Sequence, residues 1–136
     1  MNRLIFLIFL LCILHTSCES AAAEQDWIFF SKSVHAYHYY DRNGVISSKT
    51  PGVKRVGVRQ DLTALGVEDI QKRTGKKATH SRMIVEISCS TNEARTIFVE
   101  MFNNKELVLK ETKTTKWKII NPAGTNNILS EIVCSK

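Results

Sequence analysis

Hydrophobic and polar residues alternate through the middle of this chain, most regularly over residues 81–90. One set recurs at every second position and is apolar: Met83, Val85, Ile87 and Cys89. The residues between them are mostly polar: Arg82, Glu86 and Ser88. Because alternate side chains of a strand point to opposite faces, this stretch predicts a β-strand with one apolar face. Ile84 interrupts the polar side, so we expect that second face to be half covered.

Further strands are predicted wherever short β-favouring runs lie between turn-forming residues. They cover residues 26–30, 35–41, 53–62, 95–102, 106–111 and 117–120. Asn43-Gly44 is a strong hairpin signal, because both residues tolerate a positive φ angle. Gly57 falls on the polar side of its strand and indicates either a bulge or a close backbone approach. From residue 79 onward the strands follow one another through short polar turns, which predicts an antiparallel meander.

Two stretches carry helical patterns. The clearer one runs from Asn126 to Cys134, with Thr125 as the expected N-cap. Its apolar residues form one stripe: Ile128, Leu129, Ile132 and Val133. The other pattern, near Val67–Arg73 between Gly66 and Gly75, fits either a short helix or a flexible basic loop. Together these elements predict an α+β fold, an antiparallel sheet of about six strands with the last helix packed on it.

Residues 1–23 have the organisation of an export signal peptide. Arg3 precedes an apolar run, Leu4–Leu14, which is too short to span a bilayer because a spanning helix needs about 20 residues. Small residues at Ala21 and Ala23 predict cleavage after Ala23. The mature chain, residues 24–136, is then expected to be a single domain without a membrane-spanning segment.

A lipid anchor is the alternative to simple cleavage. Bacterial lipoproteins are cut before a cysteine that then carries the acyl chains, and Cys18 offers such a site. Ser17 fits the small residue expected before that cysteine, but His15 stands where an aliphatic residue is expected. We therefore expect an exported protein of the periplasm or outer cell surface, with anchoring through Cys18 as the alternative to cleavage after Ala23.

Charge and cysteine content narrow the class further. The formal net charge is +6, which favours either solubility alone or contact with anionic glycan, lipid or protein surfaces. The basic residues are scattered, so nothing indicates sequence-specific nucleic-acid binding. Without the leader, Cys89 and Cys134 remain as an even pair, and in an exported protein a disulfide is expected. Two separate reactive thiols are the alternative, although no C-x-x-C spacing accompanies them.

The order of several features resembles the surface-adhesin protein E family of bacterial exported proteins. They are Trp27, Tyr39-Tyr40-Asp41, Val53–Arg59, Ser81 ahead of Cys89, Phe102, Leu109, Trp117–Pro122 and Cys134. The resemblance implies a twisted antiparallel sheet, a C-terminal helix against it, and a disulfide between the two. It also implies a surface adhesin that binds host matrix proteins and can dimerise, although most relatives have no known function. No ligand-binding motif of the family can be placed on this sequence.

The sequence offers no convincing catalytic, metal or cofactor constellation. His35 and His38 are three apart, so in a strand they point to opposite faces and would not hold one ion. His80 could join one of them, but no cysteine or carboxylate spacing accompanies it. Paired catalytic carboxylates, a Ser-His-Asp set and a Gly-rich phosphate loop cannot be assembled either. We therefore expect a non-enzymatic protein without a cofactor.

Two groups of residues are candidates for a binding surface. The aromatic group is Tyr37, Tyr39 and Tyr40, with Trp27, Phe29 and Phe30 nearby. It predicts either core packing or an exposed aromatic platform. The basic group is Arg55, Arg59 and Arg82, which forms either an anion-binding patch or an ordinary solvated face.

These observations predict an exported adhesin-like module that holds a protein or polyanionic partner. The alternative is a periplasmic accessory or structural protein of an envelope assembly, which could form a homodimer through an edge strand.

Overall fold

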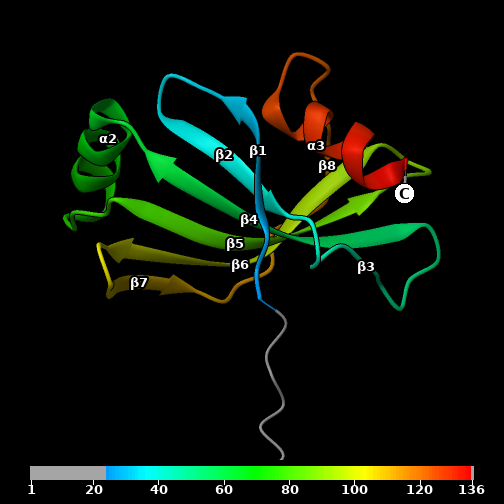
Figure 1. The fold of residues 1–136 in the computed structure, drawn as a ribbon, viewed down its shortest axis with the longest axis horizontal. Coiled ribbons are helices and arrows are strands. Elements are labelled where there is room, and N and C mark those ends of the chain that lie inside the picture. Colours follow the sequence, from blue (N-terminus) through cyan, green and yellow to red (C-terminus); the bar gives the residue numbers. More distant parts are fainter. Residues whose placement is uncertain (1–23, 136) are drawn as a thin grey trace, which may run out of the picture.

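Strand β5 (His80–Ser88) lies in the middle of an antiparallel sheet in the computed structural model, which describes residues 24–135 (Figure 1). Its direct neighbours are β4 (Val53–Leu62) and β6 (Glu93–Asn103). The other strands are β1 (Trp27–Lys32), β2 (Ala36–Asp41), β3 (Ile46–Ser47), β7 (Glu106–Glu111) and β8 (Lys118–Ile119). The order across the sheet is β1-β2-β4-β5-β6-β7, with β3 paired to β4 and β8 paired to β6. The expected signal peptide and its Cys18 lie outside the described residues.

The two faces of the sheet differ in what they carry. One face, the covered face, holds most of the hydrophobic core: Tyr40, Val56, Val58, Val85, Ile87 and Ala94. Helix α3 (Thr125–Cys134) packs on this face through Leu129 and Val133, whose side chains are almost fully buried. Figure 1 shows α3 lying over the end of the sheet nearest β1 and β8. The predicted α+β fold with a C-terminal helix on an antiparallel sheet is confirmed.

A disulfide ties α3 to the sheet. Cys89 follows β5, Cys134 ends α3, and their Cα atoms lie 5.7 Å apart. The two cysteines are 45 positions apart in the chain, and a cross-link of this length stabilises the fold by about 4 kcal/mol through the lost entropy of the unfolded chain. The pairing expected from the cysteine count is confirmed.

The ambiguous stretch before β5 is a helix, α2 (Ala64–Thr74). It begins earlier than the expected Val67 because Thr63 caps it, with the Gly66 N–H donating to Thr63 Oγ1 at 3.3 Å. Gly66 lies inside the helix and does not bound it. A Cβ at this position would collide with the carbonyl oxygen of His35, so glycine allows the close approach. Gly75 ends the helix with a φ of 72°, as expected for a residue without a Cβ.

The C-terminal part differs from the prediction in two details. Gly124 occupies the N-cap of α3 in place of the expected Thr125, and its lack of a side chain leaves the helix without a side-chain cap. The strand expected over residues 117–120 is limited to Lys118–Ile119, because the chain then turns inward and buries Ile120 in the core.

Candidate functional site

The face opposite α3 carries most of the predicted binding residues, and we call it the open face. Cross-strand pairing places Tyr39 opposite Arg59, and Arg59 opposite Arg82. Paired residues of an antiparallel sheet project to the same face, so these three side chains form one line across β2, β4 and β5. We call this line the arginine row. Both described helices pack against residues of the covered face.

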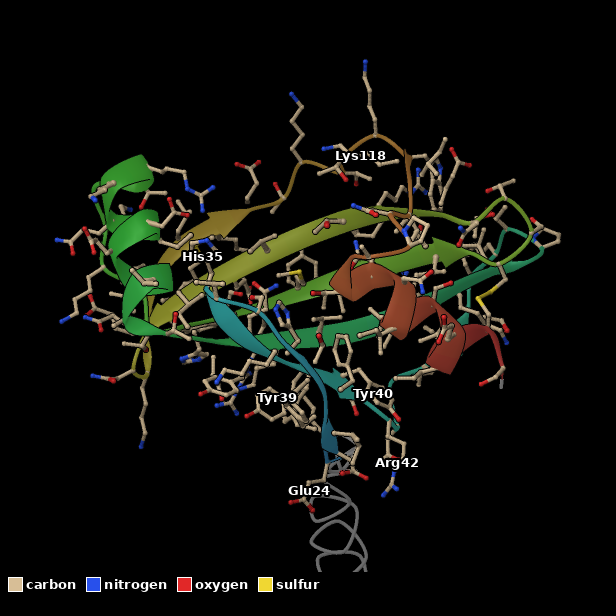
Figure 2. The ribbon with its side chains drawn as sticks, turned by 90° about the horizontal axis from the view of Figure 1, so that it is seen from above. Glu24, His35, Tyr39, Tyr40, Arg42 and Lys118 are labelled. Atoms are coloured by element: carbon tan, nitrogen blue, oxygen red, sulfur yellow. A yellow bond between two sulfur atoms is a disulfide. The ribbon has the colours of Figure 1, made fainter. Side chains whose placement is uncertain are left out.

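Tyr37 also belongs to the open face, and Tyr40 does not. Tyr37 is 39% exposed, and Lys32 Nζ lies 4.9 Å from the centre of its ring. Tyr40 is adjacent to Tyr39 and therefore points to the covered face, where it is buried in the core. Figure 2 labels Tyr39 and Tyr40, with Tyr40 nearer α3. The structure thus removes Tyr40 from the candidate surface.

Arg55 lies on the open face but is committed to a buried carboxylate. Glu86, opposite Arg55 on β5, has a side chain only 2% exposed. Arg55 Nη2 lies 2.7 Å from Glu86 Oε1, and Arg95 Nη2 lies 2.7 Å from Glu86 Oε2. We call Arg55, Glu86 and Arg95 the glutamate row. The guanidinium of Arg95 also lies over the ring of Trp117, at 4.4 Å from its centre.

The glutamate row therefore belongs to the fold more than to a binding surface. Burial alone would raise the pKa of Glu86, but the hydrogen bonds and charges of Arg55 and Arg95 outweigh it and lower the pKa. A buried carboxylate needs such partners, because an unpaired buried charge is strongly destabilising. Arg55 can leave this arrangement only at the expense of Glu86.

The arginine row has much less compensation. Arg59 Nε donates to Asp61 Oδ1 at 2.8 Å, and both side chains are about one-third exposed. Arg82 is exposed and lies over the ring of Phe102, at 5.6 Å from its centre. The carboxylate of Glu100, opposite Arg82 on β6, pairs with Lys110. Among residues 24–135, no carboxylate lies within ion-pair distance of Arg82.

Aromatic rings surround the arginine row. Phe29, which is 53% exposed, meets Tyr39 edge-on with ring centres 5.7 Å apart. His80 stacks on Phe102 with ring centres 5.0 Å apart and the planes 8° from parallel. The ring of Trp27 lies 3.8 Å from the place where a Cβ of Gly57 would sit, so this glycine marks a close approach. The β4–β5 pairing runs through Gly57 without a shift, so the alternative of a bulge is excluded.

His80 is a site residue that its sequence position did not reveal. Burial lowers its pKa, and the charges of Arg59 and Arg82 lower it further, while Asp61 acts in the opposite direction. The imidazole is therefore neutral at neutral pH. Its stacking on Phe102 depends on the β5–β6 register, in which the two residues are opposite each other.

The histidines considered as metal ligands do not come together. His38 is buried on the covered face, His35 is exposed beside α2 (Figure 2), and His80 lies on the open face. In the described part of the chain, no three His, Cys, Asp or Glu side chains gather as a metal-binding group.

Ser33 and His38 make a contact that superficially resembles a nucleophilic dyad. His38 Nε2 lies 3.1 Å from Ser33 Oγ, and Gln60 Nε2 lies 3.3 Å from His38 Nδ1. Gln60 Oε1 already accepts from Ser81 Oγ, so the Gln60 amide nitrogen donates to Nδ1 and the ring proton stays on Nε2. Nε2 then donates to Ser33 and cannot take its proton. This contact therefore links the turn between β1 and β2 to β2 and β4, and it activates no nucleophile.

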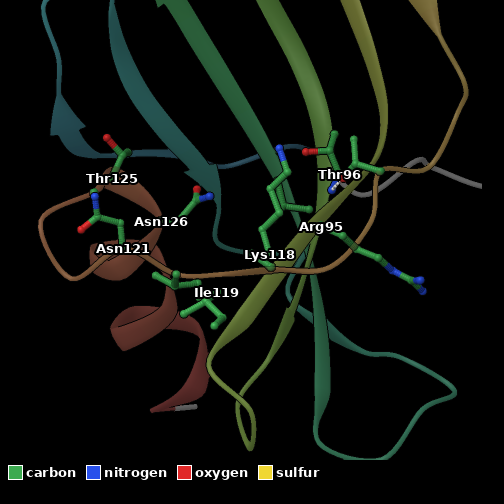
Figure 3. A pocket seen from close by; sticks show the side chains of 12 residues that line it. Arg95, Thr96, Lys118, Ile119, Asn121, Thr125 and Asn126 are labelled. Carbon is green, nitrogen blue, oxygen red and sulfur yellow. Dashed lines mark hydrogen bonds between the residues drawn. The ribbon is translucent and has the colours of Figure 1, made fainter.

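A cleft of about 420 Å³ lies where β6 and β8 meet the start of α3, and Arg95 of the glutamate row is one of its lining residues (Figure 3). Its polar walls include Thr96, Lys118, Asn121, Thr125 and Asn126. In Figure 3 the side chain of Arg95 points away from Lys118. No carboxylate or histidine lines this cleft, and its charged side chains are Arg95 and Lys118.

The fold and the cysteine placement can now be compared with known proteins. The family model of the surface-adhesin protein E matches residues 27–135. The chain belongs to this family. A structure of Haemophilus influenzae protein E has 14% sequence identity and a TM-score of 0.55, with 80% of this chain and 83% of that chain covered. A second crystal form of the same protein has 15% identity and a TM-score of 0.55, over 84% and 94% of the two chains.

Membership confirms the resemblance read from the sequence. It supports an adhesin-like surface protein of a kind that is generally non-enzymatic. At this level of identity the solved structures establish the fold alone. A comparison with curated proteins finds no match. Across residues 24–135, no helix has the length and apolarity needed to cross a membrane.

Proposed function

We propose that this protein is an exported, non-enzymatic, adhesin-like module that holds a protein or polyanionic partner at the cell envelope. The arginine row carries the proposal, because it places an exposed cation without a carboxylate partner on a face that neither described helix covers. Membership in a family of surface adhesins supports the same role. Tyr37, Tyr39, Arg59 and Arg82 are the residues that we assign to the contact.

Export is the first part of the proposal to test. We propose a single mature domain that begins at Glu24 in the periplasm or on the outer surface, with a lipid anchor at Cys18 as the alternative. Intact mass of protein isolated from the native envelope separates these forms, and reduction reveals the disulfide by a mass increase of two hydrogens. A chain that retains Met1 would contradict export.

Binding through the open face is the second part. Immobilised mature protein is titrated with matrix proteins, anionic glycans and anionic lipid vesicles at several salt concentrations. Arg82→Glu reverses one charge on the open face, and Lys118→Glu makes the same charge change near the cleft of β6 and β8. Saturable, salt-sensitive binding should be lost in the first variant and retained in the second. Absence of saturable binding to every partner, or equal loss in both variants, would overturn the proposal.

The sheet edges favour a second candidate function. β1 and β7 lie at the two ends of the strand order, and each carries an exposed apolar side chain, Phe29 and Leu107. Unpaired edge strands can pair with another chain. An accessory protein of an envelope assembly could thus form a homodimer or join a partner through an edge. Light scattering at increasing concentration, with Phe29→Lys as the edge variant, tests this; a monomer at all concentrations would exclude the homodimer.

A further inference from the structure

We propose that Arg59 and Arg82 form a binding site for a sulfate group carried on a sugar ring, so that the partner of the open face is a sulfated glycan. This inference rests on the proposed function, because it names the ligand of the same face. It begins from a contrast between two pairs of residues on the same two strands. Arg55 faces Glu86 across β4 and β5, whereas Arg59 faces Arg82.

Opposed arginines are an unfavourable choice for the fold itself. Directly opposite side chains on an antiparallel pair have Cβ atoms about 5 Å apart, and like charges at that distance are destabilising. Asp61 neutralises one of the two guanidinium groups, and Glu100 is occupied by Lys110. His80 adds no charge at neutral pH, because burial and the two arginines lower its pKa. One positive charge is left at the row, and a bound anion would compensate it.

The chemistry of guanidinium favours a sulfate ester as that anion. Each guanidinium presents a planar set of N–H donors and is only weakly hydrated. A sulfate ester has three terminal oxygens, so it can accept from both arginines at once. A carboxylate has two oxygens, which a single guanidinium satisfies through a bidentate pair.

The aromatic surroundings favour a sugar ring as the carrier. Tyr39 is next to Arg59 in the row and meets Phe29 edge-on, whereas the ring of Phe102 already has Arg82 over it and His80 stacked on it. Ring faces next to a charged group suit a ligand with an apolar C–H face and a polar edge. A sulfated sugar has both.

The test uses the oxidised mature protein and a heparin-derived hexasaccharide, titrated by calorimetry near physiological salt. The same oligosaccharide without its sulfates, with the carboxylates retained, is the ligand control. We expect desulfation to weaken binding at least about tenfold, because charge-assisted hydrogen bonds are lost. Equal affinity for the desulfated oligosaccharide would overturn the inference.

Four variants locate the site. Arg82→Gln should weaken binding about tenfold, and Arg82→Lys should restore it only in part, because an ammonium lacks the fork of donors. Asp61→Asn should strengthen binding, because it frees Arg59 from its carboxylate. Lys49→Gln removes an exposed charge elsewhere and should change affinity less than twofold. An Arg82→Gln variant that binds as Lys49→Gln does would overturn the inference.

Melting temperatures separate binding from folding. Without ligand, Arg82→Gln should melt at the same temperature as the parent protein or above it, because the substitution relieves repulsion from Arg59. Loss of affinity together with a clear drop in melting temperature would instead indicate a structural role for Arg82 and would count against the site.

The same experiments distinguish failure of this inference from failure of the proposed function. Binding to a matrix protein or to phosphatidylglycerol vesicles that is lost in Arg82→Glu, without preference for sulfate, would overturn the sulfate site and leave the proposed function standing. No saturable binding to any of these ligands would overturn both.

Discussion

The glutamate row and the arginine row both cross β4 and β5, but the first stabilises the fold and the second leaves a positive charge exposed. In the first, two arginines surround a buried carboxylate, and every charged group has a partner. In the second, two arginines face each other, and a single carboxylate partially compensates them. The contrast shows that an arginine on a sheet face can be assigned to binding or to the fold only when its cross-strand neighbour is known. Arg55 and Arg59 are four positions apart on the same face of β4 and differ in this neighbour.

Removal of the Glu86 carboxylate should change the free energy of unfolding most. Glu86→Gln leaves Arg55 and Arg95 without a counter-charge, and we expect the free energy of unfolding to fall by about 3 kcal/mol. This value is at the low end for a buried pair, because the two arginine side chains are 43% and 31% exposed. Urea denaturation measures it, with Glu106→Gln on the exposed part of β7 as the control. A loss no greater than that of the control would show that the row is dispensable for folding.

The next largest effect is expected at low pH, where the glutamate row should lose stability. The arginines lower the pKa of Glu86 below its ordinary value of 4.5. The stability that Glu86 provides is therefore fully present above that value and is lost as the pH falls through the lower folded-state pKa. The Glu86→Gln variant should lose less stability than the parent protein over the same range. Tryptophan fluorescence measures the stability of both proteins as the pH falls. An equal loss of stability in the two would contradict this role of Glu86.

Protonation of His80, beside the arginine row, should lower stability at a higher pH than protonation of Glu86 does, and by a smaller amount. The pKa of His80 is lowered from its ordinary value of 6.5, so the unfolded chain takes up a proton before the folded protein does. Stability should therefore fall as the pH drops below 6.5. His80→Gln should flatten this slope, because it removes the group whose pKa is lowered on folding. Burial also lowers the pKa of His38, so part of the slope should remain in the His80 variant.

Much of this architecture follows from local pattern. The alternation around Val85 predicts β5, the stripe around Leu129 predicts α3, and the even cysteine count predicts their disulfide. These features could be read because each depends on neighbours in the chain or on simple counting. Gly66 was misread as a boundary, because its role is a contact with the backbone of His35 in another segment.

The site was less accessible to sequence reasoning, because cross-strand register decides it. Three ladders contain a register shift, between β1 and β2, β5 and β6, and β6 and β7. Each shift changes which residues face each other, and no residue type reliably predicts where a shift occurs. The sequence could nominate Arg55, Arg59 and Arg82 as a group, but the separation of Arg55 from the other two required the pairing of β4 with β5.

A single substitution can make the arginine row resemble the glutamate row. Arg82→Glu places a carboxylate opposite Arg59, as Glu86 stands opposite Arg55. Repulsion is replaced by attraction across β4 and β5, so the free energy of unfolding should rise by about 0.5 kcal/mol. The gain is small because both positions are partly solvated. Calorimetric melting at low and high salt measures it, and the gain should shrink as salt increases. Since the same variant is expected to lose the anionic partner, a protein that becomes more stable and stops binding would show that the opposed arginines serve the ligand and not the fold. A less stable Arg82→Glu protein would mean that the cation over Phe102 is itself part of the packing of the sheet.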